Sequence, residues 1–488
     1  MGNEKNFCGH IDCQCSTMIR KGVSTSVPDG FTGFVIRHAI YPLWAWRDHP
    51  YFRQYLREFR RTQYFSRDRL EQYQVERLKT LLKHAYANCK FYRRRMDEAR
   101  FDPSLVNSIQ QLAVLPALTK RDIQDFGGEL MAENIPSKQR VKNQTGGSTG
   151  SPLQFFVDRR RFDSRMASTV RHDSWAGLRP GDWRAVLWGA RLDQLFKKGL
   201  WDRLRNALVY RTVELNTSRI RDQDWKGFVA ALRAKRPQTL VAYAQSAVLF
   251  AKYVREHHLL DISFDAVITT AEVLMPQDRE LLEATFSCRV FNRYGCREVS
   301  VIASECEHHT GMHVNADALL VEIVPDPVIP APAGRILVTD LLNYSMPLIR
   351  YEIGDVGAFA TEQNCPCGRD LPLLAEVRGR TTDFLILADG RKISGPALTL
   401  VVADMADVRQ VQFVQRSRTR VLLRVVPGNN YSEKTVAELR RRLSVYLDQN
   451  TTLEVEEAEN IASEVSGKYR FVINDMNADD TAETPVKQ

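Results

Sequence analysis

One short segment is rich in glycine and in residues with hydroxyl groups, a composition that suits anion binding. It is Thr145-Gly146-Gly147-Ser148-Thr149-Gly150-Ser151-Pro152. Its three glycines let the backbone turn tightly and present N–H groups to phosphate oxygens, and its four hydroxyls add donors. No lysine follows Gly150, so the segment is not a G-x-x-x-x-G-K-[ST] phosphate loop. A flexible Gly/Ser linker is the alternative interpretation. The strand-like run Leu153–Val157 follows directly and favours an ordered phosphate-binding loop.

Four further segments follow in a definite order, and each carries polar groups that could do chemistry. They are Tyr294–Glu298, Asp340 with Met346–Asp355, Gly379–Asp383 and Ser466–Arg470. The first sets an aromatic ring and a carboxylate beside a glycine. The second follows a predicted strand, and the last holds a lysine after a glycine near the end of the chain.

Together the five segments resemble the motifs of the adenylate-forming superfamily, which includes acyl-CoA synthetases, peptide-synthetase adenylation domains and luciferases. The phenylacetate–CoA ligase branch and its capsule-biosynthesis relatives are the most similar. The resemblance covers about residues 70–475. Each segment is a weak signal by itself, but five in the family's order and spacing are highly specific. The resemblance implies that ATP, with Mg²⁺, activates a carboxylic acid as an acyl-adenylate that then passes to CoA or another acceptor.

The resemblance also implies a role for each matching position. The ATP phosphates would be held by Thr145, Gly146, Gly147, Ser148, Thr149 and Gly150. The adenine pocket would be lined by Ala271, Glu272 and Tyr294. The remaining roles are Glu298 for Mg²⁺, Asp355 for the ribose hydroxyls, Arg380 for ribose or phosphate oxygens, and Lys468 for the substrate carboxylate and the α-phosphate.

Elementary chemistry supports these residue types independently. A carboxylate that attacks the α-phosphorus meets like charges, which a metal ion and a cation must neutralise. Lysine suits this task as a point charge on a long flexible stem, as at Lys468. An aspartate such as Asp355 can accept bonds from two ribose hydroxyls. Taken singly, each residue could instead be an ordinary surface group.

Two positions depart from the family pattern. The family hinge is the fourth position of Gly-Arg-x-Asp-Asp, and here that position is Thr382. This departure puts the domain alternation that serves the thiol step in doubt, but not adenylation. Relatives also often carry a lysine at the positions of Ser151 or Leu153, where this chain has none. One phosphate-side cation is therefore expected to be missing.

A second set of residues has the types that bind zinc. Cys306, His313, Cys365 and Cys367 offer three thiolates and one imidazole, and Cys365-Pro366-Cys367-Gly368 is a tight turn that can aim two sulfurs at one ion. A closed set of four ligands predicts a structural site. His308 and His309 are alternative nitrogen ligands, and buried or free thiols are the alternative to a metal. The N-terminal Cys8, His10, Cys13 and Cys15 are interpreted as an incidental cluster.

The elements that must position these residues predict an α/β protein, because short apolar runs alternate with helical stretches after about residue 140. The runs are Ala185–Trp188, Thr239–Tyr243, Ala266–Thr269, Val290–Phe291, Leu319–Val324 and Arg335–Val338. A helix is expected over Arg67–Ala99. The predicted architecture is a large multi-sheet α/β domain over residues 31–378 and a small mobile α+β domain over 379–475. Residues 1–30 and 476–488 are expected to be flexible tails.

Within the small domain, Asp383–Leu387 and Arg391–Ile393 flank Asp389-Gly390, which predicts a hairpin. Gln410–Val414 and Arg420–Val426 predict a second strand pair. Ser432 is expected to cap a helix that runs to about Gln449.

Composition argues against several classes of protein. The 488 residues carry a net charge of +9, spread too widely to favour a nucleic-acid binder. No apolar run reaches the ~20 residues of a membrane span, and no secretory signal opens the chain, so a cytoplasmic location is expected. Nine cysteines in such a chain argue against a disulfide framework. Residues 31–62 are aromatic and basic, and could lie on a membrane surface or pack against the body.

Three hypotheses follow for the function. The first is an AMP-forming acyl- or aryl-CoA ligase. The second keeps adenylation but passes the acyl group to an amine, a sugar or a carrier thiol. The third is a non-catalytic adenylate-binding protein. The acid itself cannot be identified, although its pocket is expected to include Phe155, Phe156, Tyr243 and Ala244.

Overall fold

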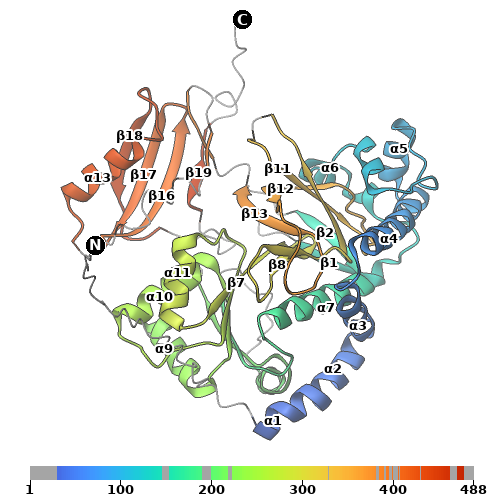
Figure 1. Cartoon of the computed structure of the whole chain (residues 1–488), viewed down its shortest axis with the longest axis horizontal. Helices are drawn as coiled ribbons and strands as arrows, with labels where there is room; N and C mark the ends of the chain where they lie inside the picture. The colour runs from blue at the N-terminus through green and yellow to red at the C-terminus, as the bar shows by residue number, and fades with distance from the viewer. Residues whose placement is uncertain are drawn as a thin grey trace, which may run out of the picture.

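An eleven-stranded sheet forms the centre of the molecule in the computed structural model (Figure 1). Its strand order is β10-β11-β12-β13-β9-β8-β7-β6-β5-β3-β4. The structure describes residues 30–144, 153–188, 199–217, 222–327, 329–380, 384–388, 392–394, 398, 405, 407–428, 430–461 and 470–476.

One half of this sheet is parallel. Its strands are β3 (Arg184–Trp188), β4 (Thr212–Asn216), β5 (Thr239–Tyr243), β6 (Ala266–Thr270) and the first residues of β7 (Arg289–Cys296). The helices α9 (Asp222–Lys235), α10 (Ala244–Glu256) and α11 (Pro276–Phe286) pack on one face of these strands and share a core with them. Strand residues alternate between the two faces, so Val267 joins this core while Ala266 and Ile268 pack on the opposite face.

The other half is antiparallel and covers a second, larger core. Its strands are β8 (Ser300–Glu305), β9 (Met312–Val314), β10 (Leu319–Val324), β11 (Gly334–Asp340), β12 (Tyr351–Phe359) and β13 (Leu373–Arg380). The strand β7 belongs to both halves: its residues 289–292 pair with β6 in parallel, and its residues 293–296 pair with β8 in antiparallel. The two halves therefore meet along β7.

Helices make up the N-terminal part, and most of them pack into the core of the antiparallel half. They are α1 (Gly30–Val35), the π-helical turn η1 (Ile36–Ile40), α2 (Tyr41–Asp48), α3 (Phe52–Thr62), α4 (Arg67–Asn88), α5 (Lys90–Glu98), η2 (Ile109–Val114), α6 (Lys120–Leu130) and η3 (Ser137–Gln139). The prediction of one helix over Arg67–Ala99 is wrong at Cys89. That residue is extended, with φ −120° and ψ 114°, and the break turns Phe91 and Tyr92 into the core.

A hairpin and a long helix lie beside this half of the sheet. The strands β1 (Arg140–Gln144) and β2 (Gln154–Asp158) pair in antiparallel and lead into α7 (Arg159–Trp175). Asp158 caps α7, because its Oδ1 accepts a bond from the Arg161 N–H at 2.8 Å. Between β3 and β4 the chain forms α8 (Leu200–Arg205) and the π-helical turn η4 (Asn206–Tyr210).

The C-terminal part has a core of its own. It contains the hairpin of β14 (Phe384–Ile386) and β15 (Lys392–Ser394), and a sheet of β16 (Val408–Ser417), β17 (Arg420–Pro427), β18 (Thr452–Glu457) and β19 (Val472–Asn474). The helix α13 (Glu433–Leu443) packs on this sheet. Figure 1 shows these strands beside α10, and the Lys252 ammonium donates to the Arg409 carbonyl at 3.5 Å.

The predicted fold class is confirmed: a large α/β part precedes a small α+β part. Both predicted strand pairs of the C-terminal part form, although Asp389 and Gly390 lie outside the described residues. Ser432 caps α13, but the helix ends at Leu443, the last residue that it buries, rather than near Gln449. Among the described residues, no helix combines the length and the apolar composition that crossing a membrane requires.

Candidate functional site

The predicted adenine-pocket residues lie just after β6 and in the second half of β7, near the edge where parallel sheets bind ligands. Ala271 follows β6 and takes the left-handed conformation, with φ +69°. The next side chain, Glu272, accepts a bond from the Gln245 N–H at 2.8 Å through its Oε2. Gln245 is in the first turn of α10, so Glu272 satisfies a free amide of that helix and faces the positive end of its dipole.

Tyr294 lies in the part of β7 that pairs with β8 and reaches across the sheet to β12. Its phenol donates to Asp355 Oδ2 at 2.7 Å. Burial and the charge of Asp355 raise the pKa of Tyr294 well above its ordinary value, so the phenol stays protonated and remains a donor. The structure thus brings together two residues that were predicted to bind adenosine from opposite sides of the antiparallel half.

Glu298 lies in the turn between β7 and β8 and is only 5% exposed. The buried Tyr351 donates its hydroxyl to Glu298 Oε1 at 2.9 Å. Gly295 opens this turn and must be glycine, because a Cβ there would lie 2.5 Å from the Ser300 carbonyl oxygen. A carboxylate held at such a turn is a suitable oxygen ligand for Mg²⁺, which is the role predicted for Glu298.

Two buried arginines of α7 make hydrogen bonds to the backbone of the turn that carries Glu298. The Arg161 guanidinium donates to Asp340 at 2.7 Å and to the Val299 carbonyl at 2.8 Å. Arg165 donates to the carbonyls of Arg297 and Glu298. Burial and the neighbouring Arg161 lower the pKa of Arg165 to about 10, so it still carries its charge at neutral pH. These two arginines fix the backbone on both sides of Glu298.

The phosphate-loop residues Thr145–Pro152 lie outside the described residues, but both flanks of this segment are placed. Gln144 at the end of β1 faces Gln154 at the start of β2. The Arg297 guanidinium donates to the Gln144 carbonyl at 3.0 Å. The chain therefore enters the predicted phosphate loop beside the turn that carries Glu298.

Of two further predicted residues, the structure describes only the backbone of Arg380. Arg380 ends β13, and its backbone is directly opposite Asp355 of β12 in the strand register. Nothing is described of its side chain. Lys468 lies outside the described residues, as do Thr381, Thr382 and Asp383.

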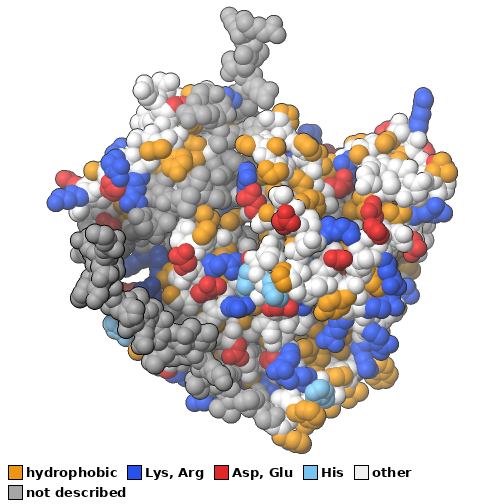
Figure 2. Space-filling model, viewed as in Figure 1, with side chains coloured by type: hydrophobic (Ala, Val, Ile, Leu, Met, Phe, Trp, Pro, Cys, Tyr) orange, Lys and Arg blue, Asp and Glu red, His pale blue; other side chains and the backbone are white. Residues whose placement is uncertain are grey.

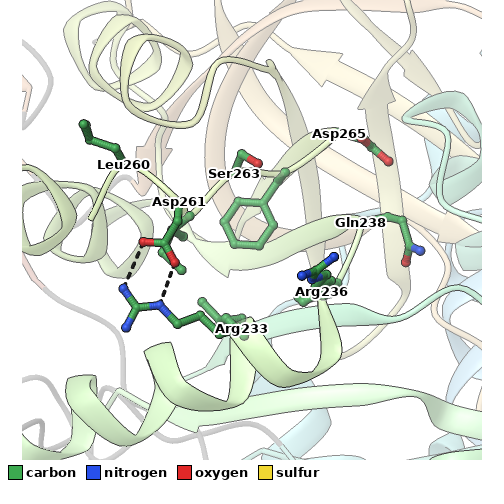
Figure 3. A pocket seen from close by; sticks show the side chains of 11 residues that line it. Arg233, Arg236, Gln238, Leu260, Asp261, Ser263 and Asp265 are labelled. Carbon is green, nitrogen blue, oxygen red and sulfur yellow. Dashed lines mark hydrogen bonds and ion pairs between the residues drawn. The ribbon is translucent and has the colours of Figure 1, made fainter. Parts of the chain in front are cut away.

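The residues expected to line the acid pocket are partly gathered at the same edge. Tyr243 ends β5, is buried, and packs its ring against Trp188 at 4.5 Å between centroids. Phe155 of β2 is buried, with the guanidinium of Arg165 5.8 Å from its ring centroid. A separate cavity of about 410 Å³ lies at the other ends of the strands, where Gln238 precedes β5 and Asp265 precedes β6 (Figure 3). It is therefore remote from the predicted adenine pocket.

The cysteine and histidine set predicted to bind zinc is brought together. Cys306 follows β8, His313 lies in β9, and the two other cysteines lie between β12 and β13. The four potential ligand atoms all lie within 4.8 Å of one another. Cys306 Sγ is 3.5 Å from Cys365 Sγ, and Cys367 Sγ is 3.3 Å from His313 Nε2. The alternative ligand His309 instead pairs with Glu305 at 3.1 Å.

These distances fit a tetrahedral zinc ion. Ligands about 2.0–2.3 Å from one tetrahedral centre lie roughly 3.3–3.8 Å apart. Two groups also donate to the sulfurs, as the partners of thiolates should. The Thr310 hydroxyl is 3.2 Å from Cys365 Sγ, and the Arg369 N–H is 3.4 Å from Cys367 Sγ. Burial lowers the pKa of His313 to about 4, so its imidazole is neutral and can act as a ligand.

Sequence reasoning missed the residues that hold the site together. Tyr351 lies inside a segment that had been singled out, but only its contact with Glu298 reveals its role. The buried arginines of α7 were not predicted, because arginine is seldom buried and its helical spacing is also that of a solvated face.

Comparison with known proteins agrees with this geometry. A family model described as the CapK C-terminal domain matches residues 385–475. A phenylacetate-coenzyme A ligase of Thermus thermophilus is 29% identical over 333 residues, which are 66% of this chain and 72% of the relative. Protein CapK of Staphylococcus aureus is 23% identical over 412 residues, which are 83% of this chain and 89% of the relative.

A solved 2-hydroxyisobutyryl-CoA ligase, in the postadenylation state, has the same fold. Its TM-score is 0.69 at 21% identity, over 84% of this chain and 90% of that chain. The order of the five segments, the sheet that brings Tyr294 to Asp355, and the two kinds of relative agree. The predicted resemblance to the phenylacetate–CoA ligase and CapK branch of the adenylate-forming proteins is thus confirmed.

Proposed function

We propose that this chain is an ATP-dependent, AMP-forming ligase that activates a carboxylic acid as its acyl-adenylate and transfers the acyl group to CoA. The observation that carries the proposal is the pair of contacts across the sheet, Tyr294 to Asp355 and Tyr351 to Glu298. These contacts support the proposed roles, in which Asp355 would bind the ribose hydroxyls and Glu298 would bind Mg²⁺. We place the reaction in the cytoplasm, where ATP and CoA are found.

In the first half-reaction, a carboxylate oxygen of the acid forms a bond to the α-phosphorus. The bond from that phosphorus to the bridging oxygen breaks, and pyrophosphate leaves. Glu298 would hold Mg²⁺, which neutralises phosphate charge. The ammonium of Lys468 would neutralise the charge that gathers between the two reactants. The ATP phosphates would be cradled by the backbone amides of residues 145–150, and Arg380 would contact ribose or phosphate oxygens.

In the second half-reaction, the thiol sulfur of CoA attacks the acyl carbonyl carbon. The bond to the AMP oxygen breaks, AMP leaves, and the thiol proton passes to solvent. The small domain over residues 379–475 would rotate between the two steps. A second candidate shares the first half-reaction, but an amine, a sugar or a carrier thiol receives the acyl group in place of CoA.

Exchange of labelled pyrophosphate into ATP, measured with a panel of aliphatic and aromatic carboxylic acids, tests activation. Acid-dependent exchange is expected with at least one acid. AMP release on addition of CoA then separates the two acceptor classes. ATP binding without exchange for any acid would instead indicate a non-catalytic adenylate-binding protein.

The Lys468→Ala variant tests the residue assigned to the α-phosphate. A loss of exchange of about 100-fold to 1,000-fold is expected, because a charge that acts in the transition state is removed. ATP binding and the thermal transition should change little. Lys434→Ala, on the exposed face of α13, is the matched control and should exchange like the unmodified protein. Full exchange by Lys468→Ala would contradict the assigned role.

We also propose that Cys306, His313, Cys365 and Cys367 hold a structural zinc ion. All four ligands come from the protein, so no coordination position is left for a substrate. Such an ion would tie the connection between β12 and β13 to the end of β8, two segments about 60 residues apart in the chain.

A further inference from the structure

Large apolar side chains are unusually exposed at two places in the described chain. Seven of the fifteen large hydrophobic residues that are exposed belong to α1, α2 and α8. These seven form what we name the apolar patch: Phe31 (82% exposed), Phe34 (59%), Leu43 (65%), Trp46 (65%), Leu200 (81%), Trp201 (80%) and Leu204 (45%). The same N-terminal segment buries Phe52 and Phe59, so its second part packs against the body, as one of the two interpretations of residues 31–62 predicted.

The two segments lie side by side although about 155 residues separate them. The turn η4, which follows α8, contacts both η1 and α2. The ring of Trp44 packs edge-on against Tyr210, with 5.9 Å between centroids. The pKa of Asp48 is lowered by its hydrogen bond from Arg47 and further by the charge of Arg205, which places the end of α2 near the end of α8.

The π-helical turn η1 aligns the apolar residues on its two sides. A π turn inserts one residue into an α-helix and rotates the helical segment after it by about 100°. With this rotation Phe31, Phe34, Leu43 and Trp46 fall within an arc of about 80°, whereas a regular helix would spread them over about 180°. Ala45 points away from this arc and is buried. The exposed apolar residues therefore share one face.

Basic residues surround the apolar patch. Residues 30–62 and 199–211 hold nine arginines and three acidic residues; of these arginines, Arg211 is buried and Arg37 pairs with Asp182. Exposed arginines flank the exposed tryptophans, as Arg47 does Trp46 and Arg203 does Trp201. Figure 2 shows hydrophobic side chains on the surface at the α1 tip, with Lys and Arg side chains beside them.

We propose that the apolar patch and its arginines dock this enzyme on an anionic membrane surface. Tryptophan, phenylalanine and leucine insert at the boundary between headgroups and acyl chains, and arginines are attracted to anionic lipid headgroups. A second copy of the chain is a less favourable binding partner, because a two-fold symmetric dimer would bring two identical positive surfaces together, and they would repel each other. The charge thus favours a negatively charged partner.

Flotation with lipid vesicles tests the proposal on the full chain. Binding is expected to vesicles with about a quarter phosphatidylglycerol, and to be at least tenfold weaker with phosphatidylcholine alone or at high salt. The double variant Leu200→Ser, Trp201→Ser should reduce binding at least tenfold, and Phe31→Ser, Trp46→Ser should do the same. Pyrophosphate exchange should be unchanged in both, since none of these residues is in the catalytic site.

The matched controls are Leu105→Ser and Leu260→Ser, which alter side chains that are 70% and 94% exposed elsewhere on the surface. Both should bind vesicles like the unmodified chain, and circular dichroism should show that every variant is folded. Absence of vesicle binding by the unmodified chain would overturn the proposal, as would equal losses in the controls. So would an oligomer that the patch variants disperse without any binding to vesicles, because the patch would then bind a second copy.

Discussion

The turn before β8 and the turn after it both carry clusters of ionisable side chains, and the two clusters use different chemistry. Before the strand lies Glu298, bonded by a phenol, with the Tyr294–Asp355 pair beside it. After the strand lie Cys306 and its three partners, within bonding distance of a common centre. Two sites at opposite ends of one strand would thus hold different ions.

The two proposed roles would separate catalysis from structural support within one sheet. Carboxylate and water oxygens suit Mg²⁺, which keeps several waters and exchanges ligands with a nucleotide. Thiolates and imidazole suit zinc, and four of them close its coordination shell. The first cluster therefore has to stay open to substrate, while the second can be permanently filled. Changes at the two ends of β8 should accordingly have separable effects on activity and on metal content.

The largest effect is expected at the open end. Glu298→Gln removes the charge that would bind Mg²⁺ but keeps the shape, so pyrophosphate exchange should fall about 100-fold to 1,000-fold. Zinc content, measured by plasma mass spectrometry, should not change. Glu280→Gln, on the exposed side of α11, is the control. Exchange within threefold of the unmodified chain would remove Glu298 from the proposed site.

A smaller effect is expected at the ribose position. Asp355→Asn weakens the bonds that a charged acceptor would make with two hydroxyls, each about 1.5–3 kcal/mol. The KM for ATP should rise roughly tenfold to 100-fold, with a smaller change in kcat, because ground state and transition state share this contact. An unchanged KM for ATP would mean that Asp355 serves only to hold Tyr294. The exposed Asp125 of α6 offers a control as Asp125→Asn.

The smallest catalytic effect is expected at the closed end. The double variant Cys365→Ser, Cys367→Ser should lose its zinc and melt roughly 5–10 °C lower, since the ion no longer joins two distant segments. Exchange measured well below the melting temperature should stay within about threefold. Cys288→Ser, a cysteine outside the cluster, should keep both metal and stability. Full zinc content in the double variant would refute the metal site.

The sequence predicted the strands well where burial and β-branching coincide. Thr239–Tyr243 and Leu319–Val324 are strands over the predicted residues, because these runs are apolar and bounded by polar connections. The break at Cys89 was not predictable, since the apolar spacing continues through it and only the packing of Phe91 and Tyr92 favours the bend. The end of α13 was placed too late for a similar reason: nothing beyond Leu443 is buried by that helix.

For the site, the sequence identified the reactive groups better than the residues that support them. Tyr294, Glu298 and Asp355 were predicted and do come together. The arginines of α7 were missed, because burial of a guanidinium depends on partners such as Asp340, which lies 179 residues away from Arg161. No local pattern distinguishes such a residue from one in solvent.

The sequence by itself determined which chemical groups are present and in what order, and these were enough to indicate acid activation by ATP. The tertiary structure decided which groups meet. Tyr294 reaches Asp355 only because β7 and β12 lie in one sheet, in an order that chain order does not predict. It likewise decided that Phe59 is buried while Phe34 faces outward. The physical reason is that local preferences act over a few residues, whereas these contacts depend on how distant segments pack.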